Sequence, residues 1–262
     1  MKKRYAALIF CAIGLLLGSI TSEAKKKPSV TAESAIVMDV QSGAILYEKN
    51  IDKREYPASI TKVMTALVAI ENSSLSETVT YSRNAVTNLE SGASNIEIQP
   101  GEKLSMEDSL YAILLMSANE ACNGVAEHVA GSIDNFVAMM NQKAKELGCT
   151  GTHFANANGL WMSNHYTTAH DMALIFQQAI KNQDFLDIIG TQSFTIEPTN
   201  MNPESRVLNT HHALLSAAAP EHYDGCFGGK TGVTAASKNT LVSGAARNGM
   251  TLIAVAMRAD AG

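Results

Sequence analysis

The feature that most constrains the fold of this chain is the position of its strand-like segments, which lie at both ends with helical patterns between them. Residues 34–40 and 44–48 flank a short turn and predict a hairpin near the start. Residues 227–234, 240–245 and 250–257 have strand patterns near the other end, and an Arg-Asn-Gly turn joins the last two. The sequence therefore predicts an α+β fold in which strands from both ends join one antiparallel sheet.

Helical patterns fill the middle of the chain. Residues 59–71 are apolar on most sides of a helical projection, which predicts a buried helix. Further helical patterns extend over residues 106–147 and predict a helical lobe. Residues 148–164 are rich in Gly and Asn and predict a long loop, which leads into a threonine-capped helix over residues 169–180.

The N-terminus has the order of a secretory signal. Residues 1–24 run from a basic start through an apolar stretch to small residues, which predicts cleavage after Ala24. The apolar run is shorter than the ~20 residues that span a bilayer, which favours cleavage over a retained anchor. We therefore expect an exported protein, in the cell wall or the periplasmic space, with one mature domain over residues 25–262.

Composition and charge exclude two broad classes of protein. Hydrophobic residues make up 46% of the chain and charged residues 17%, which suits a large folded core and not disorder. Loss of the signal removes three basic residues and one acidic residue, so the formal charge moves from −5 to −7. An acidic chain lacks the basic surface that nucleic acid requires, so no nucleic-acid partner is expected.

The cysteines and histidines predict neither a disulfide framework nor a metal site. Cys122, Cys149 and Cys226 remain after cleavage, and an odd number leaves at least one free thiol. We interpret them as buried small side chains, because a chain of this size does not need cross-links. The seven histidines are scattered, and no spacing matches a zinc site. No metal and no cofactor are expected.

Three short motifs carry the candidate chemistry. In order along the chain they are Ser59-Ile60-Thr61-Lys62, Ser117-Ala118-Asn119 and Lys230-Thr231-Gly232. The first two patterns are weak in isolation, since Ser-x-x-Lys recurs within residues 22–25 and Ser-x-Asn within residues 82–84 and 237–239. Lys-Thr-Gly occurs once, in a strand-like segment late in the chain. The same ordered triple is typical of penicillin-binding proteins and class A β-lactamases.

The first two motifs supply the residues that are expected to move protons. Ser59 and Lys62 lie three residues apart at the start of the buried helix, so both side chains project from one face. Burial and a second cation nearby would lower the pKa of the lysine, which lets the neutral amine accept the serine proton. The alternative is an N-cap serine followed by a snorkelling lysine. Ser117 and Asn119 are expected to form the opposite wall, with Ser117 relaying the proton towards the leaving amine.

The third motif is expected to bind the substrate. The N-terminus of the helix presents free N–H groups near Ser59, and the N–H of Val233 can supply a second donor to an oxyanion. Gly232 is expected to leave room for a substrate that lies along the strand. Lys230 and Thr231 would hold a carboxylate, which predicts recognition of a free C-terminus.

At these residues the chain resembles the serine-type D-alanyl-D-alanine carboxypeptidases, which are low-molecular-mass penicillin-binding proteins with a β-lactamase/transpeptidase-like fold. The resemblance covers residues 30–258 and includes further matching segments at 56–67, 158–160, 165–169 and 171–173. It implies removal of the terminal D-alanine from peptidoglycan stem peptides through an acyl-enzyme on Ser59. It also implies that β-lactam antibiotics inhibit the enzyme by acylating the same serine.

The chain departs from the family pattern in two places. Ala118 stands where the family more often has glycine, which should not alter its neighbours' roles. The family usually continues past the last strand into a helix on the sheet, and often into a second domain that ends in an amphipathic anchor. Because this sequence stops at Gly262, we expect a catalytic domain truncated at its C-terminus. Membrane contact is then expected only through the signal segment or a missing C-terminal anchor.

Three other functions remain open from the residues alone. A D,D-endopeptidase would use the same motifs on cross-linked peptides. A penicillin-sensing receptor domain would require a transmembrane segment that ties it to a signalling module. A class A β-lactamase needs a glutamate between the second and third motifs to activate water, and the nearest pattern, residues 204–209, has one residue too many.

Overall fold

The computed structural model describes residues 28–87, 89–90 and 92–260. The predicted signal segment, residues 1–24, therefore lies outside the described residues. The described residues from Thr31 onwards form one compact unit. Within the described part of the chain, no helix is long and apolar enough to cross a membrane.

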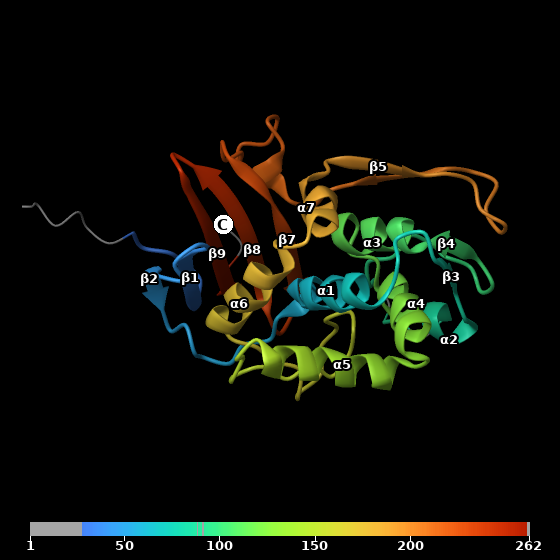
Figure 1. Ribbon diagram of the computed structural model, residues 1–262, viewed down its shortest axis with the longest axis horizontal. Helices are drawn as coiled ribbons and strands as arrows, with labels where there is room; N and C mark the ends of the chain where they lie inside the picture. The colour runs from blue at the N-terminus through green and yellow to red at the C-terminus, as the bar shows by residue number, and fades with distance from the viewer. Residues whose placement is uncertain (1–27, 88, 91, 261–262) are drawn as a thin grey trace, which may run out of the picture. The chain divides into compact units, whose positions relative to one another are not determined.

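The central sheet has five strands and is antiparallel throughout, as the sequence predicts (Figure 1). Its order is β2-β1-β9-β8-β7, so the N-terminal hairpin joins the C-terminal strands by pairing β1 with β9. This pairing places Ile36 opposite Val255 and aligns their side chains on one face. The strands are β1 (Ser34–Asp39), β2 (Ile45–Lys49), β7 (Cys226–Thr234), β8 (Lys238–Arg247) and β9 (Met250–Ala259).

The helical lobe is inserted between β2 and β7, which also confirms the prediction. Its helix α1 is buried along most of its length because every side chain from Lys62 to Ala69 is enclosed. The helices are α1 (Lys62–Asn72), α2 (Arg83–Thr87), α3 (Met106–Leu115), α4 (Asn119–Ala130), α5 (Ile133–Glu146), α6 (Ala169–Ala179) and α7 (Gln183–Gly190), with 3-10 turns η1 (Ala58–Thr61) and η2 (Ala213–Leu215).

Two small two-stranded sheets that the sequence patterns did not predict complete the lobe. One pairs β3 (Thr78–Thr80) with β4 (Lys103–Ser105), and the other pairs β5 (Ser193–Ile196) with β6 (Arg206–Asn209). The second sheet contacts α3, where Phe194 stacks on another aromatic ring, that of Tyr111. Strands of three or four residues are too short for their alternation to be recognised, so these two sheets depend on tertiary contacts.

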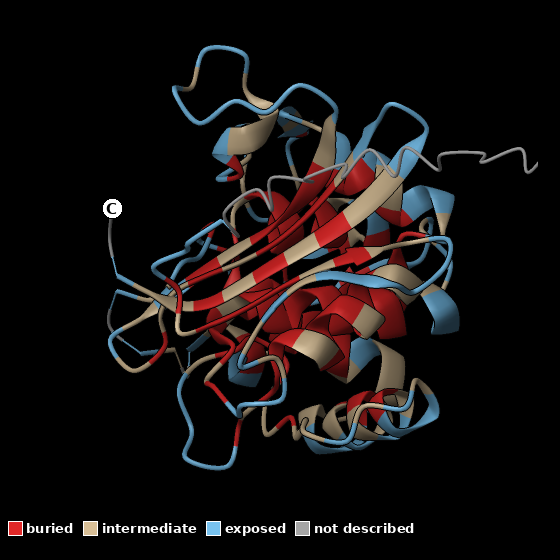
Figure 2. Cartoon of the chain, turned by 90° about the vertical axis from the view of Figure 1, so that its left-hand side faces the viewer, coloured by how far each residue is buried: buried red, intermediate tan, exposed pale blue. Residues whose placement is uncertain are grey.

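The two faces of the central sheet differ in burial. Side chains such as Met38, Val242 and Ile253 are fully buried on the face that contacts α6 and α7. Residues that alternate with them, such as Leu241 and Leu252, are half-buried on the other face, and Figure 2 shows the two classes alternating along the strands. The core therefore lies between the sheet and the helices.

The three cysteines of the described unit are free thiols, and their interpretation as buried side chains holds for Cys122. Cys122 is fully buried in α4, and Cys149 and Cys226 are half-buried. Burial raises the pKa of Cys122 to about 11, and burial with a nearby carboxylate raises that of Cys149 to about 12. These two thiols are therefore neutral at physiological pH and behave as packing groups.

Candidate active site

Ser59 lies on the 3-10 turn η1 that leads into α1, so regular α-helix begins at Lys62 and not at Ser59 as expected. Ala58 enters this turn with a left-handed backbone, at a φ of 51°. The loop opposite approaches the turn so closely that a Cβ at Gly159 would lie 2.0 Å from the carbonyl oxygen of Ala58. Packing between distant segments therefore shapes the turn that presents the serine, which local periodicity does not report.

Lys62 is fully buried, and its amine lies at the centre of a small polar cluster. Its Nζ is 3.1 Å from Ser59 Oγ, 2.8 Å from Asn119 Oδ1 and 2.5 Å from the carbonyl oxygen of Asn158. Burial lowers the pKa of Lys62, and the nearby acidic groups of Cys122 and Glu120 oppose that shift. Of the two causes that we expected, burial and a second cation nearby, burial is the main cause of the lowered pKa.

The loop that carries Asn158 is fixed by a buried histidine. His165 Nδ1 accepts a hydrogen bond from the backbone N–H of Ala155 at 3.0 Å, so its Nε2 carries the proton and donates to Thr61 Oγ1 at 2.9 Å. Burial lowers the pKa of His165 to about 3, so the ring is neutral at physiological pH. Asn158 was not among the predicted site residues, because its contact with Lys62 is made by a backbone carbonyl.

The middle motif forms the wall opposite Ser59, between α3 and α4. Ser117 has a left-handed backbone at a φ of 60°, and its buried Oγ has no hydrogen-bond partner among the described residues. Asn119 is the first residue of α4, and its Nδ2 donates to the carbonyl oxygen of Ser94 at 2.8 Å. Ser94 also lines the cleft, although no sequence pattern indicated it. A strained residue with an unpaired hydroxyl is typical of a functional position.

The third motif lies on β7, the edge strand that faces the nucleophile. Lys230 is buried, and its Nζ donates to the carbonyl oxygen of Thr231 at 2.9 Å. Burial, with a smaller contribution from the charge of Lys62, lowers the pKa of Lys230 to about 7. Val233 is 67% exposed at the open side of the strand. The motif therefore presents one buried amine and a stretch of accessible backbone to the cleft.

Gly232 is needed for the close approach of β7 to the nucleophile. A Cβ at this position would lie 2.7 Å from the backbone nitrogen of Ser59 and 2.6 Å from Thr240 Oγ1. Thr240 in turn donates to the carbonyl oxygen of Pro57 at 2.8 Å, which joins β8 to the same turn. The space beside this glycine is filled by the protein's own atoms, and the expectation that the glycine also leaves room for substrate stays a prediction.

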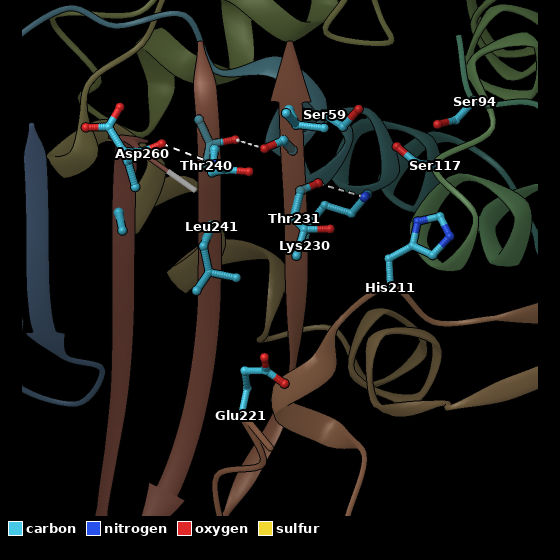
Figure 3. A pocket seen from close by; sticks show the side chains of 15 residues that line it. Ser59, Ser94, Ser117, His211, Glu221, Lys230, Thr231, Thr240, Leu241 and Asp260 are labelled. Carbon is cyan, nitrogen blue, oxygen red and sulfur yellow. Dashed lines mark hydrogen bonds between the residues drawn. The ribbon is translucent and has the colours of Figure 1, made fainter. Parts of the chain in front are cut away.

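An open cleft of about 780 Å³ brings the motifs together (Figure 3). Lys62 and Asn119 lie behind the lining and support it from the buried side. Three titratable residues, His211, Glu221 and Asp260, also line the cleft and were not predicted. The predicted residues in the lining are Ser59, Ser117, Lys230, Thr231, Gly232 and Val233.

Comparison with known proteins agrees with this geometry. A family model described as D-alanyl-D-alanine carboxypeptidase matches residues 21–261. D-alanyl-D-alanine carboxypeptidase DacF of Bacillus subtilis is 32% identical over 98% of this chain and 67% of its own length. DacB2 of Mycobacterium tuberculosis is 35% identical over 88% of this chain and 76% of its own length, whereas the match covers only 58% of Escherichia coli DacC.

Solved structures show the same fold. The crystal structure of the Streptomyces K15 DD-transpeptidase has a TM-score of 0.82 and 29% identity, and the match covers 90% of this chain and 93% of that one. A D-alanyl-D-alanine carboxypeptidase from M. tuberculosis has a TM-score of 0.83 and 32% identity over 92% and 88% of the two chains. The expected penicillin-binding fold is thereby confirmed. The chain belongs to the D-alanyl-D-alanine carboxypeptidase family of serine peptidases.

Proposed function

We propose that this protein removes the terminal D-alanine from peptidoglycan stem peptides that end in D-Ala-D-Ala. The observation that carries the proposal is the buried, desolvated amine of Lys62, whose Nζ lies 3.1 Å from Ser59 Oγ. The family supports the same activity, since its curated relatives are D-alanyl-D-alanine carboxypeptidases. The protein is accordingly a serine-type carboxypeptidase, a hydrolase of the cell wall.

The neighbours of Lys62 determine which way its lone pair points. A neutral amine has two N–H groups and one lone pair, whereas Asn119 Oδ1 and the carbonyl oxygen of Asn158 can only accept hydrogen bonds. These two oxygens therefore take both N–H groups. The lone pair is left for the hydroxyl of Ser59, which makes Lys62 the base that takes the serine proton.

The acyl-transfer step follows from this arrangement. Ser59 Oγ attacks the carbonyl carbon of the penultimate D-alanine and loses its proton to Lys62. The backbone N–H groups of Ser59 and Val233 are proposed to stabilise the oxyanion, and Lys230 with Thr231 to hold the terminal carboxylate. The proton then reaches the leaving amine through Ser117, so the C–N bond breaks and D-alanine departs.

Water completes the cycle by hydrolysing the ester on Ser59. A class A β-lactamase places a dedicated glutamate next to this ester. Glu204, which begins the nearest matching pattern, is exposed in the connection between β5 and β6, outside the set of residues that lines the cleft. Nothing in the comparisons favours the β-lactamase, receptor or endopeptidase alternatives. We therefore propose that a penicillin adduct on Ser59 is hydrolysed slowly.

The test measures the peptide and the antibiotic reactions together. The protein should release D-alanine from an acyl-D-Ala-D-Ala peptide, and it should gain the mass of one penicillin per chain, on the peptide that contains Ser59. Intact-mass spectrometry followed by peptide mapping makes the second measurement. A folded protein without an adduct contradicts the proposal, and an adduct that disappears within seconds indicates a β-lactamase instead.

The lowered pKa of Lys230 predicts a pH dependence of substrate selection. Its folded-state pKa is about 7, so the free enzyme loses the positive charge at this position as the pH rises from 6 to 9. The kcat/KM for a peptide with a free terminal carboxylate should therefore fall about tenfold relative to that for its C-terminal amide. A ratio that stays constant over this range would show that Lys230 does not hold the carboxylate.

The proposal extends to location, although two of its parts lie outside the described residues. The curated relatives are D-alanyl-D-alanine carboxypeptidases by name, and a substrate in the cell wall supports action outside the cytoplasmic membrane. Cleavage after Ala24 and a continuation of the domain beyond Gly262 stay predictions. Edman sequencing of the secreted protein tests the first of them, since it should begin at Lys25.

A further inference from the structure

An exposed tryptophan lies close to the turn that carries the nucleophile. Trp161 is the single tryptophan of the chain, is 51% exposed, and meets the ring of Tyr56 edge-on at a centroid distance of 6.2 Å. Met162 beside it is 43% exposed. Tyr56 lies three residues before Ser59. Trp161 lies three residues after Asn158, whose backbone carbonyl binds Lys62. This aromatic pair, Trp161 and Tyr56, is therefore attached to the catalytic centre through both neighbouring segments.

The loop holds its tryptophan in place from both sides. The carbonyl oxygen of Leu160 accepts a hydrogen bond from Asn156 Nδ2 at 2.8 Å, and the carbonyl oxygen of Met162 accepts one from the backbone N–H of His165 at 3.0 Å. The flanking backbone is thus fixed even though the indole is open to solvent. A large aromatic group that is exposed on a fixed backbone is typical of a binding surface, because little side-chain entropy is lost when a ligand packs on it.

A polar hollow of about 540 Å³ is lined by Tyr56 and continues from the aromatic pair. Four of its charged groups are paired with one another, since Lys53 bridges Glu33 and Glu55, and Arg258 bridges Glu33. Arg54 also lines it and stacks 4.6 Å above the ring of Tyr166. The hollow therefore offers both donors and acceptors with little net charge, which suits a neutral ligand that carries many hydroxyl and amide groups.

An aromatic face beside paired charged groups is the chemistry that recognises a sugar ring. The apolar C–H face of a pyranose packs on an aromatic ring, while its hydroxyl and acetamido groups exchange hydrogen bonds with carboxylates, guanidinium groups and amines. A purely apolar partner would leave these polar groups without bonds, and a strongly charged partner would have to break their pairs. Among the ligand classes available to a cell-wall enzyme, the glycan fits this surface best.

The distances are compatible with a glycan that is attached to the substrate peptide. Tyr56 and Ser59 are three residues apart, so their Cα atoms are separated by at most about 11 Å. A stem pentapeptide has four residues on the acyl side of the bond that is cut, and these reach about 13 Å when extended. The sugar that bears the peptide can therefore contact Trp161 or Tyr56 while the terminal D-alanine occupies the cleft.

We propose that Trp161 and Tyr56, with the adjoining hollow lined by Arg54 and Glu33, form a subsite for the N-acetylated amino sugar to which the stem peptide is joined. This subsite rests on the proposed carboxypeptidase function and adds to it. The enzyme would then act on glycan-linked stem peptides in preference to free ones, because an aromatic contact with the sugar strengthens binding during the reaction.

Activity on two substrates separates a glycan contact from a peptide contact. The wild-type enzyme should cleave a disaccharide-linked pentapeptide with a kcat/KM about tenfold above that for the free pentapeptide, as expected for one well-packed aromatic contact. Trp161→Ala should remove this preference and leave the free pentapeptide within about twofold of wild type. Trp161→Phe should retain most of the preference, and Val207→Ala, which alters a 59% exposed apolar residue on β6, should leave both substrates unaffected.

Binding can also be measured without catalysis, because the tryptophan fluorescence of the chain comes from Trp161 alone. Titration of the Ser59→Ala protein with the peptide-free disaccharide should shift or quench this emission in a saturable way. No change in emission overturns the subsite, as does equal loss of activity on both substrates in Trp161→Ala. If instead the wild type releases no D-alanine while the disaccharide still binds, the carboxypeptidase proposal fails and the subsite stands.

Discussion

Replacement of Lys62 by methionine is expected to slow both penicillin acylation and D-alanine release by at least about 10³-fold, while the protein remains folded. The amine is the one buried base in contact with Ser59 Oγ among the described residues. Methionine fills a similar volume without a lone pair, so Ser59 would lose the group that takes its proton. Stopped-flow acylation with a fluorescent penicillin measures the rate constant directly.

Stability measurements distinguish loss of the base from loss of the fold. Burial lowers the pKa of Lys62, so the unfolded chain binds this proton more tightly than the folded protein. The free energy of unfolding of the wild type should therefore increase as the pH rises towards 10.5, the ordinary pKa of lysine. In Lys62→Met the slope of this increase with pH should be smaller. Lys181→Met at the exposed end of α6 is the matched control and should change neither the rate nor the slope. Near wild-type acylation in Lys62→Met would exclude Lys62 as the base.

A single methyl group at Gly232 is expected to lower activity by at least about 10²-fold, because it separates β7 from the turn that carries Ser59. The added Cβ would lie 2.7 Å from the nitrogen of Ser59, which is closer than such atoms pack, and 3.1 Å from that of Ile60, which is tight. The strand must therefore move away, which enlarges the gap between the two proposed oxyanion donors. Overpacking of this kind also costs about 1–3 kcal/mol of stability.

The control for this variant is another glycine with an ordinary backbone. Gly190 ends α7, and a Cβ there would have its nearest contact at 3.2 Å, with the carbonyl oxygen of Phe227. Gly190→Ala should keep most of the penicillin acylation rate, whereas Gly232→Ala should lose it at temperatures where both proteins are folded. Equal acylation rates in the two variants, with thermal unfolding followed in parallel, would show that β7 and η1 can separate without cost to the chemistry.

Several features of the protein were determined by local sequence. Alternation of apolar residues at the two ends predicted the strands that meet in one sheet, and helical periodicity over residues 59–71 predicted the buried helix. The order of the motifs indicated Ser59 and Lys62, and the cleft does contain Ser117 and Lys230. Such features are readable because periodicity and turn chemistry act over a few neighbouring residues.

Tertiary structure alone decided how those residues become a reactive site. The carbonyl oxygen of Asn158 reaches Lys62 from 96 positions away in the chain, and Ser94 binds Asn119 through its backbone. Neither contact depends on side-chain pattern, since any residue carries a carbonyl. The pKa of Lys62 depends on how completely other segments exclude water from it, and the space beside Gly232 depends on where β7 packs against η1. These are properties of distant surfaces brought together, so they exist only in the folded chain.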